Sequence, residues 1–460
     1  MFALRLESFG DNIAVVSDDG ASVSYRQLAK LSDDCLNTAS LPKRTLLAIE
    51  CTNSLQSLAA YLGALRSGHP VLMVDSQLSH DLRHRLYSHY RVSHVFGQSG
   101  FWNPTENSPP QLHPDLSLLL STSGSTGSPK LVKLTNKNLE ENSRSISRYL
   151  ALTQLDRPIT SLPIHYSYGL SVINSHLSIG ATLLVTDEPV TAKLFWDFFC
   201  AGEATSIAGV PMTYAMLKKM RFERINIPSL RTLTQAGGRL PAEIVRWLSE
   251  ISTERGYRFF VMYGQTEATA RISYVPPDRL PEKAESIGLA IPGGKLDLID
   301  DFGDEIHEPG MTGELRYSGD NVMMGYASQA GDLILPDVMK GVLMTGDLAH
   351  RDEDGFYYID GRKKRFLKIF GNRISLDEVE AYLNTSGLSV AVTGIDDQLL
   401  IAVHDTNSFD IKNIADKVSS YYRIHRSAIK ILTVKDIPLS SAGKIQYSEL
   451  LKIMLADKEQ

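Results

Sequence analysis

Hydroxyl side chains and glycines fill the eight positions from Ser121 to Ser128, and Pro129 and Lys130 close the run, which reads STSGSTGSPK. Glycine lets the backbone turn successive N–H groups toward one point, where they form a nest for an anion. The hydroxyls add donors and Lys130 adds a positive charge, so the chemistry suits a polyphosphate. The spacing is not that of a Walker A loop, GxxxxGK followed by Ser or Thr. A flexible polar linker is the alternative, but the apolar run 118–120 before the loop and a helical pattern from Asn136 favour a phosphate loop.

The elements that must position this loop alternate between strand and helix. Residues 45–50 read as a buried strand, 54–66 repeat apolar residues at helical spacing, and 70–74 are again strand-like. The same alternation recurs at 181–186, 194–201, 206–210 and 211–220. Strand–helix–strand repetition predicts parallel sheets with helices on their faces.

The pattern changes near Gly293, where glycine separates the short strand-like segments 295–299, 313–317 and 355–359. A basic run at 361–365 follows. Beyond it we expect helices over 377–384 and 411–422 and strands over 390–395, 399–403 and 429–434. We therefore predict an α/β protein. Its large N-terminal domain, 1–360, holds parallel-sheet α/β subdomains and a small β-rich subdomain, and a small mobile α+β C-terminal domain covers 361–460.

The composition is that of a globular protein, with 43 % hydrophobic and 22 % charged residues among 460. A net charge of −6 argues against nucleic acid or an anionic membrane as the main partner. The start of the chain lacks the apolar core of a signal peptide, and no apolar run approaches the roughly 18 residues of a membrane-spanning helix. The three cysteines are far apart, which argues against a disulfide framework. We expect a cytoplasmic protein without a membrane span.

The run from Ser121 to Lys130 resembles the phosphate loop of the adenylate-forming (AMP-binding) superfamily, which includes acyl-CoA synthetases, aryl-acid ligases and peptide-synthetase adenylation domains. Four further motifs follow in the family's order. They are YGQTE at 263–267, TGD at 345–347, a hinge motif from 361 to 378, and PLSSAGKI at 438–445. The chain is most similar to a short, freestanding acyl-acid ligase.

The resemblance implies a two-step reaction. A carboxylate attacks the α-phosphorus of ATP and gives an acyl-adenylate and pyrophosphate, and a thiol then takes the acyl group. Such a reaction depends on positioning and on neutralising charge rather than on covalent help from the protein. The implied cofactors are ATP and Mg²⁺, with CoA or the phosphopantetheine of a carrier protein as the acceptor and a small carboxylic acid as the substrate.

The resemblance also implies residue roles. Lys444 bridges the substrate carboxylate and the α-phosphate, Thr266 donates to that phosphate, and Glu267 binds Mg²⁺. Tyr263 stacks on the adenine, and Asp347 accepts the ribose hydroxyls. The implied nucleotide-binding residues are Thr122, Ser123, Gly124, Ser125, Thr126, Gly127, Lys130, Gly237, Gly238, Tyr263, Gly264, Asp347 and Arg362. In the hinge motif, Lys364 is the implied pivot between two domain orientations, and Gly371 lines the thiol tunnel.

The implied acyl pocket is lined by His165, Tyr166, Gly169, Val210, Tyr214 and Arg271. Amino-acid-loading members of the family usually place an Asp near this segment, yet there is none between Asp156 and Asp187. We therefore expect a carboxylic acid that lacks an α-amino group. Arg271 could pair with an acidic tail of the substrate, but a structural salt bridge is the simpler expectation.

The acceptor stays open, because residues 390–403 are shorter than the region that frames the CoA nucleotide in many acyl-CoA synthetases. Basic residues in 362–373 and 423–426 could face an acidic acyl or peptidyl carrier protein. The alternatives are a ligase with an amine or oxygen acceptor or an amino-acid substrate, and a non-catalytic nucleotide- or acyl-binding module. The presence of Lys444, Glu267 and Asp347 argues against the module.

Overall fold

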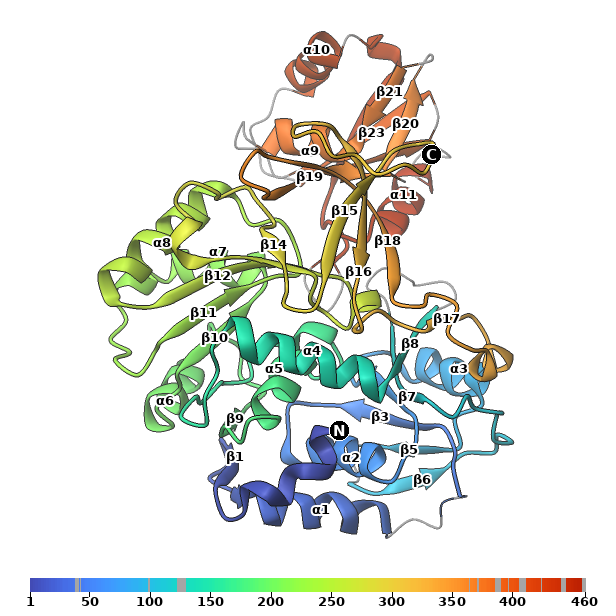
Figure 1. Ribbon diagram of the computed structural model, residues 1–460. Helices are drawn as coiled ribbons and strands as arrows, with labels where there is room; N and C mark the ends of the chain where they lie inside the picture. Colours follow the sequence, from blue (N-terminus) through green and yellow to red (C-terminus); the bar gives the residue numbers. More distant parts are fainter. Residues whose placement is uncertain are drawn as a thin grey trace. The chain divides into compact units, whose positions relative to one another are not determined.

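The computed structural model (Figure 1) describes residues 1–37, 41, 43–97, 100–121, 130–363, 365–369, 372–384, 390–395, 397–404, 411–422, 424–439 and 444–456. The chain packs into two compact units. Unit 1 consists of residues 1–296 and 317–343, and unit 2 consists of residues 297–316 and 344–460.

The first sheet of unit 1 has seven strands in the order β17-β8-β7-β4-β3-β5-β6. Its centre is parallel and consists of β3 (Leu47–Cys51), β4 (Val71–Asp75), β5 (His94–Phe96) and β7 (Leu116–Ser121). Three antiparallel strands complete the sheet: β6 (Trp102–Pro104) at one edge, and β8 (Leu131–Thr135) followed by β17 (Gly325–Ala327) on the other side. Helices α1 (Tyr25–Asn37), α2 (Leu55–Arg66) and α3 (His80–Tyr90) belong to this half of the unit. The central strands are almost continuously apolar, as strands covered on both faces must be.

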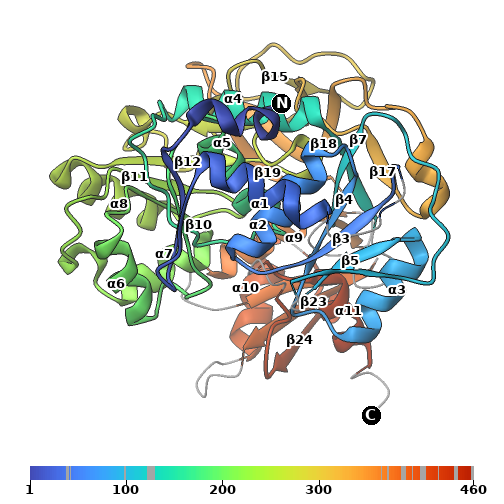
Figure 2. The same ribbon diagram turned by 90° about the horizontal axis from the view of Figure 1, so that it is seen from below.

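The second sheet has the order β10-β11-β12-β13-β14. Strands β10 (Ser206–Gly209), β11 (Thr232–Gln235) and β12 (Arg258–Tyr263) are parallel, and β13 (Ser273–Val275) and β14 (Leu289–Ala290) are antiparallel. Helices α6 (Lys193–Ala201), α7 (Pro211–Lys219) and α8 (Ala242–Arg255) accompany it. Helices α4 (Asn136–Tyr149) and α5 (Ser167–Leu177) lie between the two sheets in both views (Figure 1 and Figure 2). Their apolar faces join the cores of both sheets, so they fix how the sheets meet.

The smaller elements of unit 1 surround these sheets. A third sheet has the order β2-β1-β9, with β2 (Ser22–Ser24), β1 (Ile13–Ser17) and β9 (Leu183–Val185). The 3-10 helices of the unit are η1 (Phe2–Phe9), η2 (Phe222–Arg224), η3 (Thr266–Ala268), η4 (Pro277–Arg279) and η5 (Ala330–Ile334).

Unit 2 holds most of an antiparallel sheet made of β15 (Lys295–Ile299), β16 (Gly313–Ser318), β18 (Val342–Arg351) and β19 (Tyr357–Arg362). A two-stranded ribbon follows, β20 (Phe366–Ile369) with β21 (Asn372–Ser375). The last sheet is β22 (Val390–Ile395), β23 (Gln398–His404) and β24 (Ile429–Val434). Its helices are α9 (Leu376–Asn384), α10 (Ile411–Tyr422), η6 (Arg426–Ala428) and α11 (Tyr447–Ala456). Apolar residues of α9, α10 and this sheet form one core.

The predicted fold class is confirmed, and the strands and helices listed in the sequence pattern occur within a few residues of their expected places. The antiparallel strands β6, β8 and β17 were not expected. The compact units divide at residue 344, and unit 2 also takes in residues 297–316, while the predicted domains 1–360 and 361–460 stay a prediction. The hinge at residue 361 stays a prediction. Among the described helices, none combines the length and the apolar character needed to cross a membrane.

Helices α1 and α2 approach so closely that one position tolerates only glycine. A Cβ atom at Gly63 would lie 2.3 Å from the carbonyl oxygen of Ser32. We expect Gly63→Ala to destabilise the protein by about 1–3 kcal/mol, because the helices must separate. This loss outweighs the gain of about 1 kcal/mol in helix propensity. Urea or thermal unfolding measures the change.

Gly331→Ala is the matched control, because a Cβ atom there would meet no heavy atom within 4 Å. Its unfolding midpoint should equal that of the parent. A Gly63→Ala protein that unfolds at the parent's midpoint would contradict the proposed close approach.

Candidate active site

The predicted phosphate loop connects two paired strands at the carboxyl end of a parallel sheet. Strand β7 ends at Ser121, and Ser121 pairs with Leu131 of β8. The two ends of the loop are therefore neighbours, and Lys130 lies directly before β8. Ligands of open α/β sheets bind at this edge. The predicted contacts Thr122, Ser123, Gly124, Ser125, Thr126 and Gly127 lie outside the described residues.

A tyrosine that the sequence pattern did not single out connects the end of this loop to the predicted magnesium ligand. The Tyr326 hydroxyl donates to Oε1 of Glu267 at 2.7 Å. The Lys130 ammonium lies 4.8 Å from the centroid of the Tyr326 ring. Burial, followed by the charge of Glu267, raises the pKa of Tyr326, so its hydroxyl remains a donor at neutral pH. The hydroxyl of Tyr326 thus holds a carboxylate, and the face of its ring holds a cation.

Glu267 lies in a tightly folded loop between β12 and β13. A Cβ atom at Gly264 would lie 1.8 Å from the carbonyl oxygen of Ala270, so the start and the end of the loop nearly touch. Thr269 and Ala270 adopt φ values of 52° and 97°, which are unfavourable for residues other than glycine. Tyr263, the predicted adenine-stacking residue, ends β12, and its hydroxyl accepts from Nε2 of Gln265 at 3.1 Å.

Buried Asn321 holds this loop in its strained shape. Its Nδ2 donates to the carbonyl oxygens of Ala268, at 2.7 Å, and Arg271, at 2.8 Å. The Thr269 hydroxyl donates back to the carbonyl oxygen of Asn321 at 2.6 Å. Tyr317 in turn donates to Oδ1 of Asn321 at 2.8 Å. Asn321 is therefore a supporting residue of the site, and no motif in the sequence marked it.

The start of α5 brings the predicted acyl pocket next to the predicted nucleotide site. The hydroxyl oxygens of Ser167 and Thr266 lie 3.1 Å apart. A Cβ atom at Gly237 would lie 2.5 Å from the Tyr166 hydroxyl, and Gly237 has φ +87°. Glycine is required at position 237 on both counts. Gly238 follows, and its carbonyl oxygen accepts from Nε2 of Gln235 at 2.8 Å.

The other predicted pocket residues differ in how exposed they are. Tyr214 is fully buried, and its hydroxyl donates to the carbonyl oxygen of Thr234 at 2.7 Å, so it lies in the core behind β11. Gly169 lets α5 approach the chain at Pro163, whose carbonyl oxygen would lie 2.3 Å from an added Cβ atom. Val210 is buried before α7. Their roles toward a substrate stay predictions.

His165 lies beside two carboxylates. Its Nε2 is 3.7 Å from Oδ2 of Asp75, and its Nδ1 has no hydrogen-bond partner within the described part of the chain. Burial lowers the pKa of His165, and the charges of Asp75 and Asp187 oppose that effect. The role of His165 toward a substrate stays a prediction.

The expectation of a structural salt bridge for Arg271 is wrong. The side chain is 1 % exposed, and its guanidinium carbon lies 4.0 Å from the centroid of the Tyr168 ring. Across the residues that the structure describes, Nε and Nη1 have no hydrogen-bond partner and no carboxylate forms an ion pair with the side chain. The ring face offsets part of the cost of burying this charge, but the cation has no counter-ion.

Unit 2 carries the predicted ribose-binding residues as a pair. Asp347 of β18 is 3 % exposed, and its Oδ1 lies 3.2 Å from Nε of Arg362, the residue opposite it on β19. The Thr345 hydroxyl donates to the carbonyl oxygen of Leu315 at 2.8 Å and accepts from the N–H of Asp347 at 3.2 Å. The TGD turn is thereby anchored, with its carboxylate beside a cation.

The predicted hinge residues Lys364 and Gly371 lie outside the described residues. The basic side chains around them that are described have acidic partners. Lys363 pairs with Glu314 at 2.7 Å, and Arg365 pairs with Asp377 at 2.6 Å and Glu380 at 3.3 Å. Further along the chain, Arg426 pairs with Asp416 at 2.9 Å. These ion pairs leave less charge for an acidic partner than the sequence suggests.

Lys444 lies next to a paired set of described residues. Leu439 and Ile445 form an antiparallel bridge, and the N–H of Gln446 donates to the carbonyl oxygen of Pro438 at 2.8 Å. The Lys444 side chain is partly exposed. Its catalytic role stays a prediction.

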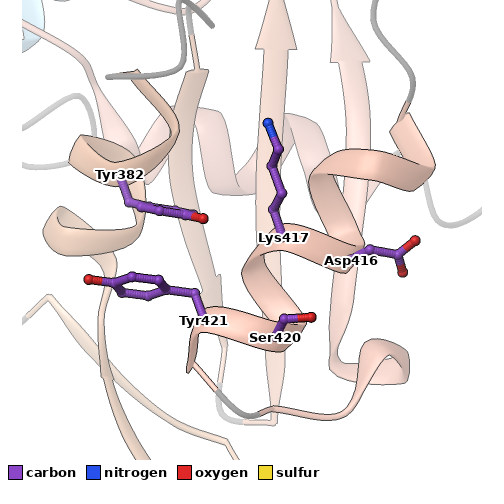
Figure 3. Close-up of a pocket in the computed structure, with 5 residues that line it drawn as sticks. All are labelled: Tyr382, Asp416, Lys417, Ser420 and Tyr421. Atoms are coloured by element: carbon purple, nitrogen blue, oxygen red, sulfur yellow. The ribbon is translucent and has the colours of Figure 1, made fainter.

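A surface depression of about 440 Å³ lies between α9 and α10 (Figure 3). The rings of Tyr382 and Tyr421 stack on one side of it, with their centroids 4.4 Å apart. Asp416, Lys417 and Ser420 complete the lining. None of the predicted site residues takes part, so this depression is separate from the candidate site.

Comparisons with known proteins agree with the motifs. A family model described as AMP-binding enzyme matches residues 98–327, half of the chain. The indoleacetate–CoA ligase of Aromatoleum aromaticum is 28 % identical over 75 % of this chain and 69 % of its own length. The putative acyl-CoA synthetase YngI of Bacillus subtilis is 30 % identical over 72 % of this chain and 62 % of its own length. The chain thus spans about two thirds of the length of these curated relatives.

Among solved structures, the O-succinylbenzoate coenzyme A synthetase (MenE) of Bacillus subtilis in complex with AMP has the same fold. The TM-score is 0.81 at 22 % identity, and the match covers 98 % of this chain and 97 % of that one. This likeness concerns the fold. With the family model, the five ordered motifs and this shared architecture all in agreement, the chain belongs to the AMP-binding enzyme family.

Proposed function

We propose that the chain is an ATP-dependent acid–thiol ligase. It activates a carboxylic acid without an α-amino group to an acyl-adenylate, releases pyrophosphate, and transfers the acyl group to a thiol. The observation that carries this proposal is the grouping of Lys130, Tyr326 and Glu267 at the exit of the predicted phosphate loop. The relatives named as CoA ligases support the thiol as the second substrate.

The groups at this place fit a magnesium–polyphosphate complex. Mg²⁺ prefers a few carboxylate oxygens together with phosphate oxygens and water. Tyr326 holds Oε1 of Glu267 and so orients the carboxylate that would bind the metal. When bound, the metal neutralises phosphate charge. Thr266, held beside Ser167, donates to the α-phosphate, and Lys130 adds a positive charge at the loop exit.

In the first step, a carboxylate oxygen of the substrate forms a bond to the α-phosphorus, and the bond from that phosphorus to the bridging oxygen of pyrophosphate breaks. Negative charge builds up where two anions meet, so a cation between them lowers the barrier. Lys444 is the proposed cation, and Asp347 with Arg362 hold the ribose. In the second step, the thiolate attacks the acyl carbon and AMP leaves.

CoA is the proposed acceptor, and phosphopantetheine on an acidic carrier protein is the alternative. The relatives named above are a CoA ligase and a putative acyl-CoA synthetase. In addition, the ion pairs of Lys363, Arg365 and Arg426 reduce the free positive charge that would attract an acidic carrier. We propose the cytoplasm as the place of action, since the composition and the scattered cysteines suit a reducing compartment.

The direct test is carboxylate-dependent ATP–pyrophosphate exchange over aliphatic, aryl, dicarboxylic and amino acids. Exchange with one class of acid supports the proposal. ATP binding without exchange for any acid would favour the non-catalytic module. Rates of acyl transfer to CoA and to phosphopantetheine on a carrier protein, compared at equal thiol concentration, then distinguish the two acceptors.

Lys444→Ala separates the two steps. Adenylation should fall about 10²–10³-fold, because a positive charge placed against the developing negative charge is lost. Transfer from a supplied acyl-adenylate to the thiol should be retained. Pyrophosphate exchange and thioester formation measure the two steps separately.

Lys452→Ala is the matched control, since Lys452 is an exposed lysine of α11 that contacts Glu449. Both half-reactions should keep the parent's rates in this variant. Equal losses of both half-reactions in Lys444→Ala would contradict the assignment of Lys444 to the first step alone.

Tyr326→Phe tests the positioning of Glu267. The phenylalanine ring stays beneath Lys130, so only the hydrogen bond to the carboxylate is removed. We expect the Mg²⁺ concentration for half-maximal exchange to rise about tenfold, as for other residues that orient a metal ligand. Exchange rates across a Mg²⁺ titration provide the measurement.

Tyr421→Phe removes a hydroxyl from an exposed tyrosine of α10 and should leave the Mg²⁺ titration unchanged. If Tyr326→Phe has the parent's Mg²⁺ requirement, Tyr326 does not position the metal ligand.

A further inference from the structure

Arg271 heads the fully buried large side chains of the described residues, and two of its three nitrogens are not satisfied. It is 1 % exposed, and Nε and Nη1 lack a hydrogen-bond partner within the described part of the chain. Arg258, the first residue of β12, shows the usual arrangement. Arg258 also lies over an aromatic ring, that of Phe260, but it donates to the carbonyl oxygen of Leu150 and to the Thr232 hydroxyl.

An arginine stays protonated in proteins, so this burial places a full charge away from water. Burying a charge is costly unless it is paired and hydrogen-bonded. The Tyr168 ring, 4.0 Å from the guanidinium carbon, offsets part of the cost. The ring cannot satisfy the N–H groups of the guanidinium, because those groups point outward in the guanidinium plane and the ring lies over its face. What the cation lacks is an anion with acceptor oxygens.

Among the hydroxyls around Arg271, only that of Tyr149 hydrogen-bonds to the guanidinium, and Nε and Nη1 still have no acceptor in the described part of the chain. The Tyr168 hydroxyl lies 2.8 Å from both oxygens of Thr234 and donates to its carbonyl, while the Tyr149 hydroxyl donates to Sδ of Met262 at 3.0 Å. Burial raises the pKa of Tyr149, Tyr166 and Tyr168, and the charge of Arg271 lowers it in each. The field of the cation therefore reaches three tyrosines that have few other charges near them.

This cation lies within the candidate site rather than in a remote core. Arg271 ends the loop that carries Thr266 and Glu267, and Asn321 fixes its backbone. Tyr168, which stacks on it, follows Ser167, the residue beside Thr266. Tyr166, whose hydroxyl lies against Gly237, is on the same turn of chain. Arg271, Tyr168 and Tyr166 therefore belong to the segments that carry the predicted nucleotide and acyl-pocket residues.

We propose that Arg271 binds the second, non-reacting carboxylate of the substrate, so that this ligase activates a dicarboxylic acid. The inference rests on the proposed function and specifies its substrate class. A planar carboxylate accepts two parallel N–H bonds from a guanidinium, and this arrangement is the strong, directional form of the interaction. The reacting carboxylate is assigned to Lys444, so Arg271 addresses a different one. No bond is made or broken at Arg271.

The test uses matched acids that differ only in the second charge. ATP–pyrophosphate exchange is measured with succinate, glutarate, adipate and phthalate, and with the monomethyl ester of each. The parent protein should activate at least one diacid with a kcat/KM about tenfold to a hundredfold above that of its monoester, as charge-assisted hydrogen bonds imply. This comparison needs no variant, so it holds whether or not substitutions fold.

Arg271→Met then keeps the volume and removes the charge. It should abolish the preference for the diacid mainly through KM, and activity with the monoester should be kept or raised. Arg271→Lys keeps a charge without the paired donors and should give an intermediate ratio. Arg258→Met is the matched control. It removes another arginine over an aromatic ring and should leave the ratio of diacid to monoester unchanged.

Two results would overturn the inference and leave the proposed function standing. The parent protein could exchange with monoesters or simple monoacids as well as with every diacid. Alternatively, Arg271→Met could lower kcat/KM equally for diacid and monoester while its melting temperature equals the parent's, which would make Arg271 a general structural cation. A lack of exchange with any acid, despite ATP binding, would instead contradict the proposed function itself.

Discussion

The amide of Asn321 makes the two hydrogen bonds on which the candidate site depends. It ties the carbonyl oxygens of Ala268 and Arg271 together. The intervening residues Thr269 and Ala270 are thereby kept at positive φ, a conformation that costs of order 1–3 kcal/mol for each such residue. The same closure aims Glu267 toward Tyr326 and Arg271 toward Tyr168. One loop thus carries a carboxylate next to the predicted phosphate-binding residues and a cation next to the predicted acyl-pocket residues.

The fold could be predicted because its signals are local. Apolar runs such as residues 71–75 predict a strand, and helical repeats such as 55–66 predict a helix, whatever they pack against. Strand β8 was not predicted, since the lysine at its centre, Lys133, is of a type usually found on the surface. In the fold Lys133 is 1 % exposed, and its ammonium donates to the carbonyl oxygens of Asp332 and Leu335. Only the tertiary structure provides those acceptors.

The same limit separates the site residues that the sequence indicated from those it missed. Glu267 and Asp347 were predicted because each belongs to a short motif of consecutive residues. Tyr326 and Asn321 act on the loop from 59 and 53 positions away, through strand pairing and a buried amide. No spacing rule connects such positions. For Arg271 the sequence pattern offered two alternatives, and only the packing shows that no acid accompanies it among the described residues.

Two buried charges in this chain differ in whether the protein itself supplies a partner of opposite charge. Asp347 is nearly as buried as Arg271, yet Arg362 lies opposite it on the adjacent strand, so the pair is largely balanced before any ligand arrives. Arg271 has an aromatic face and no anion within the described residues. A fold that only needed to fill this space could use an apolar side chain at lower cost. The second substrate carboxylate that we propose would supply the partner that this permanently charged group lacks, on a loop that is itself held in strain.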